Sequence, residues 1–278
     1  MAATGPKFAD LVPRIISALV LLLVGGAGLW FGGMVLAVLL SILGAAMLWE
    51  YFRLIVRLAP RIARAATGVT ALLLAVSLVL EDVFAIVENG RVLAPAPIAL
   101  IVLAICMCAV VALVRKSKLE TIFGAMIPLG TFLFFYVHQS SPFVMWLVVA
   151  IIVATDVSGY FFGKLIGGPK FWPALSPNKT WSGAGAGWVA AAIIAVAVSW
   201  GEGAAAMLLN VAFLVLVSFA AQMADIAESA LKRRAGVKDS SNLLPGHGGV
   251  LDRFDGMIGG FVMAGLVFLI FGHFLSVT

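Results

Sequence analysis

Long, continuously apolar segments recur along this chain of 278 residues and constrain its fold more than any other feature. A helix that crosses the hydrocarbon core of a bilayer needs roughly 17–25 residues. A transmembrane barrel is a poor alternative, because its strands alternate over about 10 residues. The candidate spans number nine, several of them short or rich in glycine, and lie near residues 15–31, 34–52, 65–80, 97–114, 121–137, 142–162, 183–200, 204–224 and 256–275.

The composition excludes a soluble protein of this length. Hydrophobic residues make up 63% of the chain and charged residues only 11%, whereas soluble domains carry about 25% charged residues. No stretch is polar enough to form a separate soluble domain. We therefore expect an all-α fold, a polytopic transmembrane helical bundle that forms a single integral membrane domain over residues 1–278.

The basic residues predict the orientation of this bundle. If the N-terminus is cytoplasmic, nine spans place 17 of the 18 Lys and Arg residues on the inner side and only Arg91 outside. Such a bias is what the positive-inside rule describes. Topology thus explains most of the net charge of +5, and we expect no nucleic-acid partner. We predict a cytoplasmic N-terminus, an outside C-terminus and residence in the plasma (inner) membrane.

Two polar segments on the predicted cytoplasmic side are longer than a simple connection needs, and such loops often carry function. One lies near residues 156–182 and the other near residues 222–255. In the second, Asp225 and Glu228 share one helix face, Ser229 lies one turn from Asp225, and Asp252 and Asp255 repeat the spacing of three. Further ionisable residues lie between these pairs, namely Lys232, Arg233, Lys238, Asp239 and His247.

This combination predicts a site for a polyanion and a metal ion. Carboxylates bind Mg²⁺, which keeps water and substrate phosphate in its coordination shell, and Lys and Arg neutralise phosphate oxygens. The glycine-rich turn that ends at Gly248 and Gly249 allows backbone N–H groups to approach a phosphate. Juxtamembrane charges are usually topology anchors or a solvated helix face. That simpler interpretation suits the arginines at 53, 57, 61 and 64, but segment 222–255 holds more ionisable residues than anchoring requires.

Two smaller clusters belong to the first segment. Asp156 lies inside a predicted span, where an acid is costly unless it is paired or coordinating. The spacing of Gly159 and Gly163 favours a close helix contact, as does the small-residue stretch 183–187. The sequence LSPNKTWSG, residues 175–183, offers polar groups for phosphates or a base, namely Ser176, Asn178, Lys179 and Thr180.

Residues 229–255 resemble the signature of the phosphatidate cytidylyltransferases, and LSPNKTW and the D-x-x-x-Y-x-x-G-K run from Asp156 to Lys164 are also similar to that family. The likeness covers roughly residues 150–260. Two positions depart from the family, which often has Glu at Ser182 and Ala at Gly159. The matching signature residues are Ser229, Lys232, Arg233, Lys238, Asp239, Pro245, His247, Gly248, Gly249, Asp252, Arg253 and Asp255.

The resemblance implies transfer of CMP from CTP to phosphatidate, giving CDP-diacylglycerol and pyrophosphate in phospholipid biosynthesis. It implies Mg²⁺ held by carboxylates, for which Asp225 and Asp252 are the first choices, and it leaves open whether a second cation binds. The expected partners, besides the two substrates, are membrane lipid and a second copy of the chain in a homodimer. The implied catalytic residues are Asp225, Asp252, Lys232, Arg233, Lys238, Asp239, His247, Arg253 and Asp255. The implied substrate-binding residues are Asp156, Ser176, Asn178, Lys179, Thr180, Ser229, Gly248 and Gly249.

Two other classes compete with this interpretation. A transporter would also contain many spans and an acid such as Asp156 within one of them, but the polar residues gather at one face and no inverted repeat is visible. Another lipid enzyme, a CDP-alcohol phosphotransferase, would need a D-G-x-x-A-R run, which is absent. A structural membrane protein would not require the cytoplasmic cluster.

Overall fold

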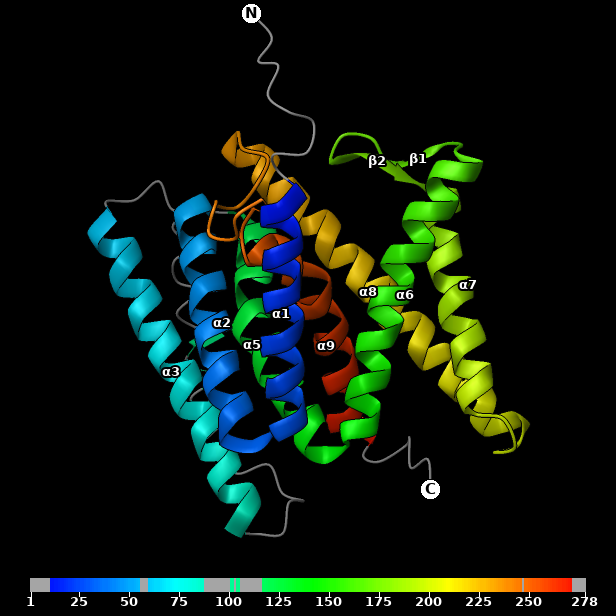
Figure 1. Ribbon diagram of the computed structural model, residues 1–278, viewed down its shortest axis with the longest axis horizontal. Helices are drawn as coiled ribbons and strands as arrows, with labels where there is room; N and C mark the ends of the chain where they lie inside the picture. The colour runs from blue at the N-terminus through cyan, green and yellow to red at the C-terminus, as the bar shows by residue number, and fades with distance from the viewer. Residues whose placement is uncertain are drawn as a thin grey trace, which may run out of the picture.

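The computed structural model describes residues 11–55, 60–87, 101–102, 104–105, 117–246 and 248–271. These residues form helices and one short hairpin, in agreement with the expected helical class (Figure 1). The elements in chain order are α1 (Leu11–Phe31), α2 (Gly33–Ile55), α3 (Pro60–Val87), α5 (Lys118–Ser140), α6 (Pro142–Ile166), β1 (Lys170–Trp172), β2 (Ser176–Thr180), α7 (Trp181–Val198), α8 (Ala204–Ala235) and α9 (Leu251–Phe271).

The helices have the length and surface of membrane spans. Seven of them, in α2, α3 and α5 to α9, are long and apolar enough to cross a bilayer. Large side chains such as Leu22 and Leu165 are 71% and 81% exposed, as lipid-facing residues are. The chain is therefore an integral membrane protein. The first predicted span falls on α1, and the fourth, 97–114, lies mostly outside the described residues.

The bundle packs through three connected apolar clusters. Helix α5 lies at the centre, against α9 on one side and α2 and α3 on the other. Helices α6 and α7 form a pair that packs on α8. The predicted glycine contact is confirmed, because a Cβ atom added at Gly183 would lie 2.6 Å from the carbonyl oxygen of Gly159. Glycine thus allows α6 and α7 to approach closely.

Two element boundaries differ from the predicted spans and shape the site. Helix α8 has 32 residues, and a helix of that length extends about 48 Å, well beyond a hydrocarbon core of about 30 Å. Helix α9 begins at Leu251 rather than near 256. It starts early because the buried carboxylate of Glu50 accepts the backbone N–H groups of Val250 and Leu251, which would otherwise lack partners.

The β1–β2 hairpin was not predicted. It is antiparallel, with Lys170 opposite Thr180 and Trp172 opposite Ser176. Strands of three and five residues are too short to show a clear alternation in the sequence. Figure 1 shows this hairpin, the loop between α8 and α9, and the C-terminal end of α2 at one end of the bundle. We call this end the site end.

Candidate active site

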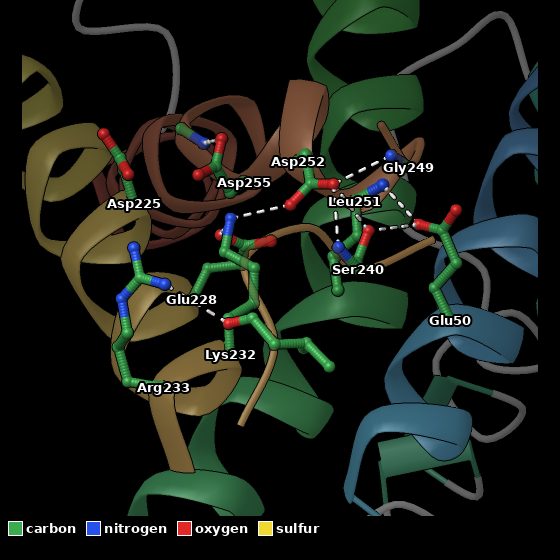
Figure 2. A network of polar contacts seen from close by, with 12 residues as sticks. Glu50, Asp225, Glu228, Lys232, Arg233, Ser240, Gly249, Leu251, Asp252 and Asp255 are labelled. Atoms are coloured by element: carbon green, nitrogen blue, oxygen red, sulfur yellow. Dashed lines mark hydrogen bonds and ion pairs between the residues drawn. The ribbon is translucent and has the colours of Figure 1, made fainter. Parts of the chain in front are cut away.

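Asp252, in the first turn of α9, is the centre of a polar network at the site end (Figure 2). Its Oδ2 accepts hydrogen bonds from the backbone N–H of Ser240 at 2.9 Å and of Gly249 at 2.8 Å. The Ser240 hydroxyl lies 3.0 Å from the same oxygen. The other oxygen, Oδ1, receives Lys232 Nζ at 2.6 Å. Asp252 therefore joins α9 to the α8–α9 loop and to α8.

Lys232 also forms an ion pair with Glu228, one turn earlier on α8. The Glu228 side chain is fully buried and its Oε1 has no hydrogen-bond partner among the described residues. One ammonium group thus lies between two carboxylates, Glu228 and Asp252. A buried carboxylate without full compensation is costly, so the ion pair with Lys232 is important for holding Glu228 in this position.

Asp225 lies one turn farther toward the membrane on α8 and forms an ion pair with Lys179 of β2. Asp255 of α9 is close enough to interact electrostatically with Asp225, Lys179 and Lys232. Its Oδ1 accepts the backbone N–H of Gly256 at 2.8 Å. In the view of Figure 2, Asp255 is drawn between Asp225 and Asp252, the two residues predicted to bind Mg²⁺.

Glu50 of α2 is a site residue that the sequence reasoning missed. It is fully buried and accepts hydrogen bonds from the loop and from the start of α9. The signal for it was present, since Glu50 is the only acid in the predicted span 34–52. An ionisable residue at membrane depth is a functional candidate by default.

A pocket of about 620 Å³ lies among α6, the hairpin, α7 and α8, and we call it the hairpin pocket. Five residues predicted from the two polar segments line it, Asp156, Asn178, Lys179, Thr180 and Asp225. The structure therefore brings together positions that are up to 69 residues apart in the chain (225 − 156). Ser176, at the other end of β2, does not line this pocket.

Local hydrogen bonds hold three residues that line the hairpin pocket, Gly167, Thr180 and Gly183. The Thr180 hydroxyl accepts the backbone N–H of Gly183 at 3.2 Å and so caps the N-terminus of α7. The Ser182 hydroxyl donates to the carbonyl oxygen of Gly167 at 2.5 Å and ties α7 to the end of α6. Ser182, where the family often has Glu, thus has a structural contact here.

The remaining predicted residues that the structure describes lie on α8, on α9 and in the loop between them. A pocket of about 570 Å³, the loop pocket, is lined among others by Lys238, Asp239, Gly248 and Arg253. Ser229 is half-buried on α8. In Figure 2 the guanidinium group of Arg233 points toward the side on which Asp225 lies. Gly249 has its N–H bonded to Asp252, and His247 lies outside the described residues.

The side chains between α8 and α9 fit a hard divalent cation. Glu228 supplies a buried oxygen without a hydrogen bond, and four carboxylates, Asp225, Glu228, Asp252 and Asp255, face Lys179 and Lys232. In the described part of the chain, no three metal-binding side chains converge into a ready-made metal site. Mg²⁺ suits such a site, because it takes one or two protein carboxylates and completes its shell with water and substrate phosphate.

The family model described as the cytidylyltransferase family matches residues 12–274. Three proteins named phosphatidate cytidylyltransferase are similar to the chain. The Helicobacter pylori J99 protein is 41% identical over 160 residues, which cover 56% of this chain and 59% of the relative.

The Bacillus subtilis protein is 44% identical over 124 residues, or 43% of this chain and 44% of the relative. The Brucella abortus biovar 1 protein is 44% identical over 117 residues, or 39% and 40%. The chain therefore aligns with about half the length of these curated relatives. Because the family model spans nearly the whole sequence, the chain belongs to the cytidylyltransferase family.

Proposed function

We propose that this protein transfers CMP from CTP to phosphatidate and releases pyrophosphate, giving CDP-diacylglycerol for phospholipid synthesis. The observation that carries the proposal concerns Asp225. This residue lines the hairpin pocket and is also near enough to Asp255, at the start of α9, to interact with it electrostatically. A pocket at the end of a membrane bundle lets a nucleotide from water meet a phosphate on a lipid. The similarity to proteins named phosphatidate cytidylyltransferase supports the same reaction.

In the proposed reaction, a phosphate oxygen of phosphatidate attacks the α-phosphorus of CTP. A new P–O bond forms, the bond from the α-phosphorus to the bridging oxygen breaks, and pyrophosphate leaves with the electron pair. Protein groups have little covalent chemistry to perform in such a transfer, so positioning and charge stabilisation carry the rate. No covalent enzyme intermediate is required.

We propose that Asp225 on α8 and Asp252 on α9 hold Mg²⁺, with Asp255 between them as a further carboxylate ligand. When bound, the ion supplies Lewis-acid stabilisation of phosphate oxygens. Lys179 lines the hairpin pocket, and Lys238 and Arg253 line the loop pocket. We propose that these three cations bind phosphate oxygens of the substrates. Lys232 keeps Asp252 oriented through its ion pair.

We further propose a single membrane domain over residues 1–278 with nine spans, a cytoplasmic N-terminus and an outside C-terminus. Helix α1 begins at the site end and α9 ends at the opposite end of the bundle, which supports an odd number of crossings (Figure 1). The site end then faces the cytoplasm, where CTP is present, and the protein lies in the plasma membrane. We also propose that two copies of the chain form a homodimer.

Purified protein incubated with CTP, phosphatidate and Mg²⁺ tests the activity. Both CDP-lipid and pyrophosphate are expected in equal amounts. Release of inorganic phosphate alone, or no turnover in a lipid environment where the protein remains folded, would exclude the proposed transfer.

A further inference from the structure

The carboxylate of Glu50 connects the N-terminal half of the chain to the site. Glu50 lies near the C-terminal end of α2, and its partners lie 190 to 201 residues later in the chain. Its Oε1 accepts from the Ser241 hydroxyl at 2.5 Å and from the Val250 N–H at 3.0 Å. Its Oε2 accepts from the Leu251 N–H at 2.7 Å and lies 3.1 Å from the Ser240 hydroxyl.

These contacts make the Glu50 carboxylate dependent on one loop conformation. The side chain is fully buried, and the four groups that donate to it all belong to the loop or to the first residue of α9. Hydrogen bonds to a charged group are roughly twice as strong as neutral ones, and a buried charge that loses them is costly. Any displacement of the loop therefore carries a large penalty at Glu50.

Packing around the carboxylate restricts the loop further. A Cβ atom added at Gly249 would lie 1.9 Å from the Ser240 hydroxyl oxygen and 2.7 Å from Glu50 Oε1. Only glycine fits between the Ser240 hydroxyl and the Glu50 carboxylate, so the backbone at residue 249 packs directly against Glu50. The N–H of this same Gly249 donates to Asp252. Gly249 therefore contacts both carboxylates, because it packs against Glu50 and donates its N–H to Asp252.

Ser240 forms a second link between the two carboxylates. Its hydroxyl oxygen lies 3.1 Å from Glu50 Oε2 and 3.0 Å from Asp252 Oδ2. A serine hydroxyl has a single proton to donate, so it bonds one of the two carboxylates at a time. When Asp252 engages a cation, Glu50 offers the hydroxyl proton an alternative acceptor without any movement of the loop.

We propose that Glu50 is a positioning residue for the transfer reaction, acting on Asp252 through Ser240 and Gly249. The proposal rests on the proposed function for its kinetic consequence, but its structural part stands independently. Glu50 holds the turn from 240 to 251 so that Asp252 presents its carboxylate toward Lys232 and Asp255. The N-terminal half of the bundle is in this way part of the site, rather than only a membrane anchor.

Glu50→Gln tests the proposal, because it keeps the size of the side chain and removes the charge. Its matched control is Leu74→Ala, a fully buried residue in α3 outside the site, which lowers stability without touching the loop. Ser241→Ala is a milder second variant that removes one of the four bonds. Two measurements are needed, both well below the melting temperature of each variant. The first is amide hydrogen exchange at residues 249–251 without Mg²⁺. The second is turnover across a Mg²⁺ titration, which gives kcat and the Mg²⁺ concentration for half-maximal turnover.

We expect exchange at 249–251 to accelerate at least about tenfold in Glu50→Gln and kcat to fall about 10- to 100-fold, as for a misplaced catalytic group. The Mg²⁺ requirement rises in the same variant, whereas Leu74→Ala changes neither readout locally. Ser241→Ala shows a smaller shift in the same direction and decides the matter if Glu50→Gln does not fold.

Unchanged exchange and Mg²⁺ dependence in Glu50→Gln, or equal changes in Leu74→Ala, would overturn the proposal. If the wild-type protein has no transferase activity, the proposed function fails. The exchange measurement still decides whether Glu50 holds the loop.

Discussion

Lys232 Nζ lies 2.6 Å from Asp252 Oδ1 and also contacts the buried carboxylate of Glu228. One side chain therefore joins α8 to α9 and compensates a charge that has no access to solvent. Glu228 and Asp252 are 24 residues apart (252 − 228), and the end of α8 and the α8–α9 loop between them carry most of the signature found in the sequence. The ion pairs of Lys232 hold the two ends of this loop in one arrangement.

Replacing Lys232 with Met is expected to destabilise the protein strongly. Removing one partner of a buried ion pair leaves the other charge uncompensated, which costs about 3–5 kcal/mol. The melting temperature in detergent measures the loss. Lys238→Met, at an exposed position of the loop, is the control and is expected to melt like the wild type. The double variant Lys232→Met, Glu228→Gln should recover much of the lost stability. Equal melting temperatures of Lys232→Met and the control Lys238→Met would contradict this account.

Gly249→Ala is expected to disrupt the loop, because the new Cβ atom would lie 1.9 Å from the Ser240 hydroxyl oxygen. Overpacking of a filled site costs about 1–3 kcal/mol, and the displaced loop would also move Asp252. Thermal melting and Mg²⁺-dependent turnover report the two effects. Gly185→Ala, where an added Cβ meets nothing within 4 Å, serves as the control. A Gly249→Ala protein that melts and turns over normally would show that the loop is not tightly fitted.

Sequence periodicity and composition were sufficient for the helical membrane class, because a bilayer requires long apolar helices. The close approach of Gly159 and Gly183 was also predictable, since small residues at helical spacing have few other uses in a membrane. The β1–β2 hairpin was not, because strands as short as these leave no periodic signal. The early start of α9 depends on Glu50, a residue 201 positions away.

The site was predicted as a set of residues but not as an arrangement. Asp156, Lys179 and Asp225 were expected separately, and the fold places them in one pocket. The proposed ligands Asp225 and Asp252 were expected to hold one Mg²⁺ together, and in the view of Figure 2 Asp255 is drawn between them. Hydrogen-bond partners such as Ser240 depend on the path of the loop, which local patterns do not determine.

The topology predicts that the two ends of the chain lie on opposite sides of the membrane. A reporter placed after residue 278 should read the outside, and one placed within residues 235–242 should read the cytoplasm. The reason is the distribution of Lys and Arg, 17 of 18 on one side. Both reporters on the same side would contradict the nine-span topology.

Selectivity for CTP is a further expected property of the activity. Competition with ATP, GTP and UTP in the transfer assay measures it, with CDP-lipid as the product that is followed. We expect excess ATP to leave the rate nearly unchanged. Equal turnover with ATP would leave a nucleotidyl transfer without the cytidine preference that the family name describes.

The Mg²⁺ dependence of Asp225→Asn and Asp252→Asn tests the central claim most directly. Both substitutions keep the size of the side chain and remove a charge, and loss of one electrostatic stabiliser often costs about 10²–10³-fold in rate. Asp225→Asn should need more Mg²⁺ while melting near the wild type, because Asp225 bonds Lys179 outside the loop. Asp252→Asn should lose both metal response and stability, because Asp252 also holds Ser240 and Gly249. If both variants fold and retain near-normal rates with an unchanged Mg²⁺ titration, the proposed metal site between α8 and α9 is wrong.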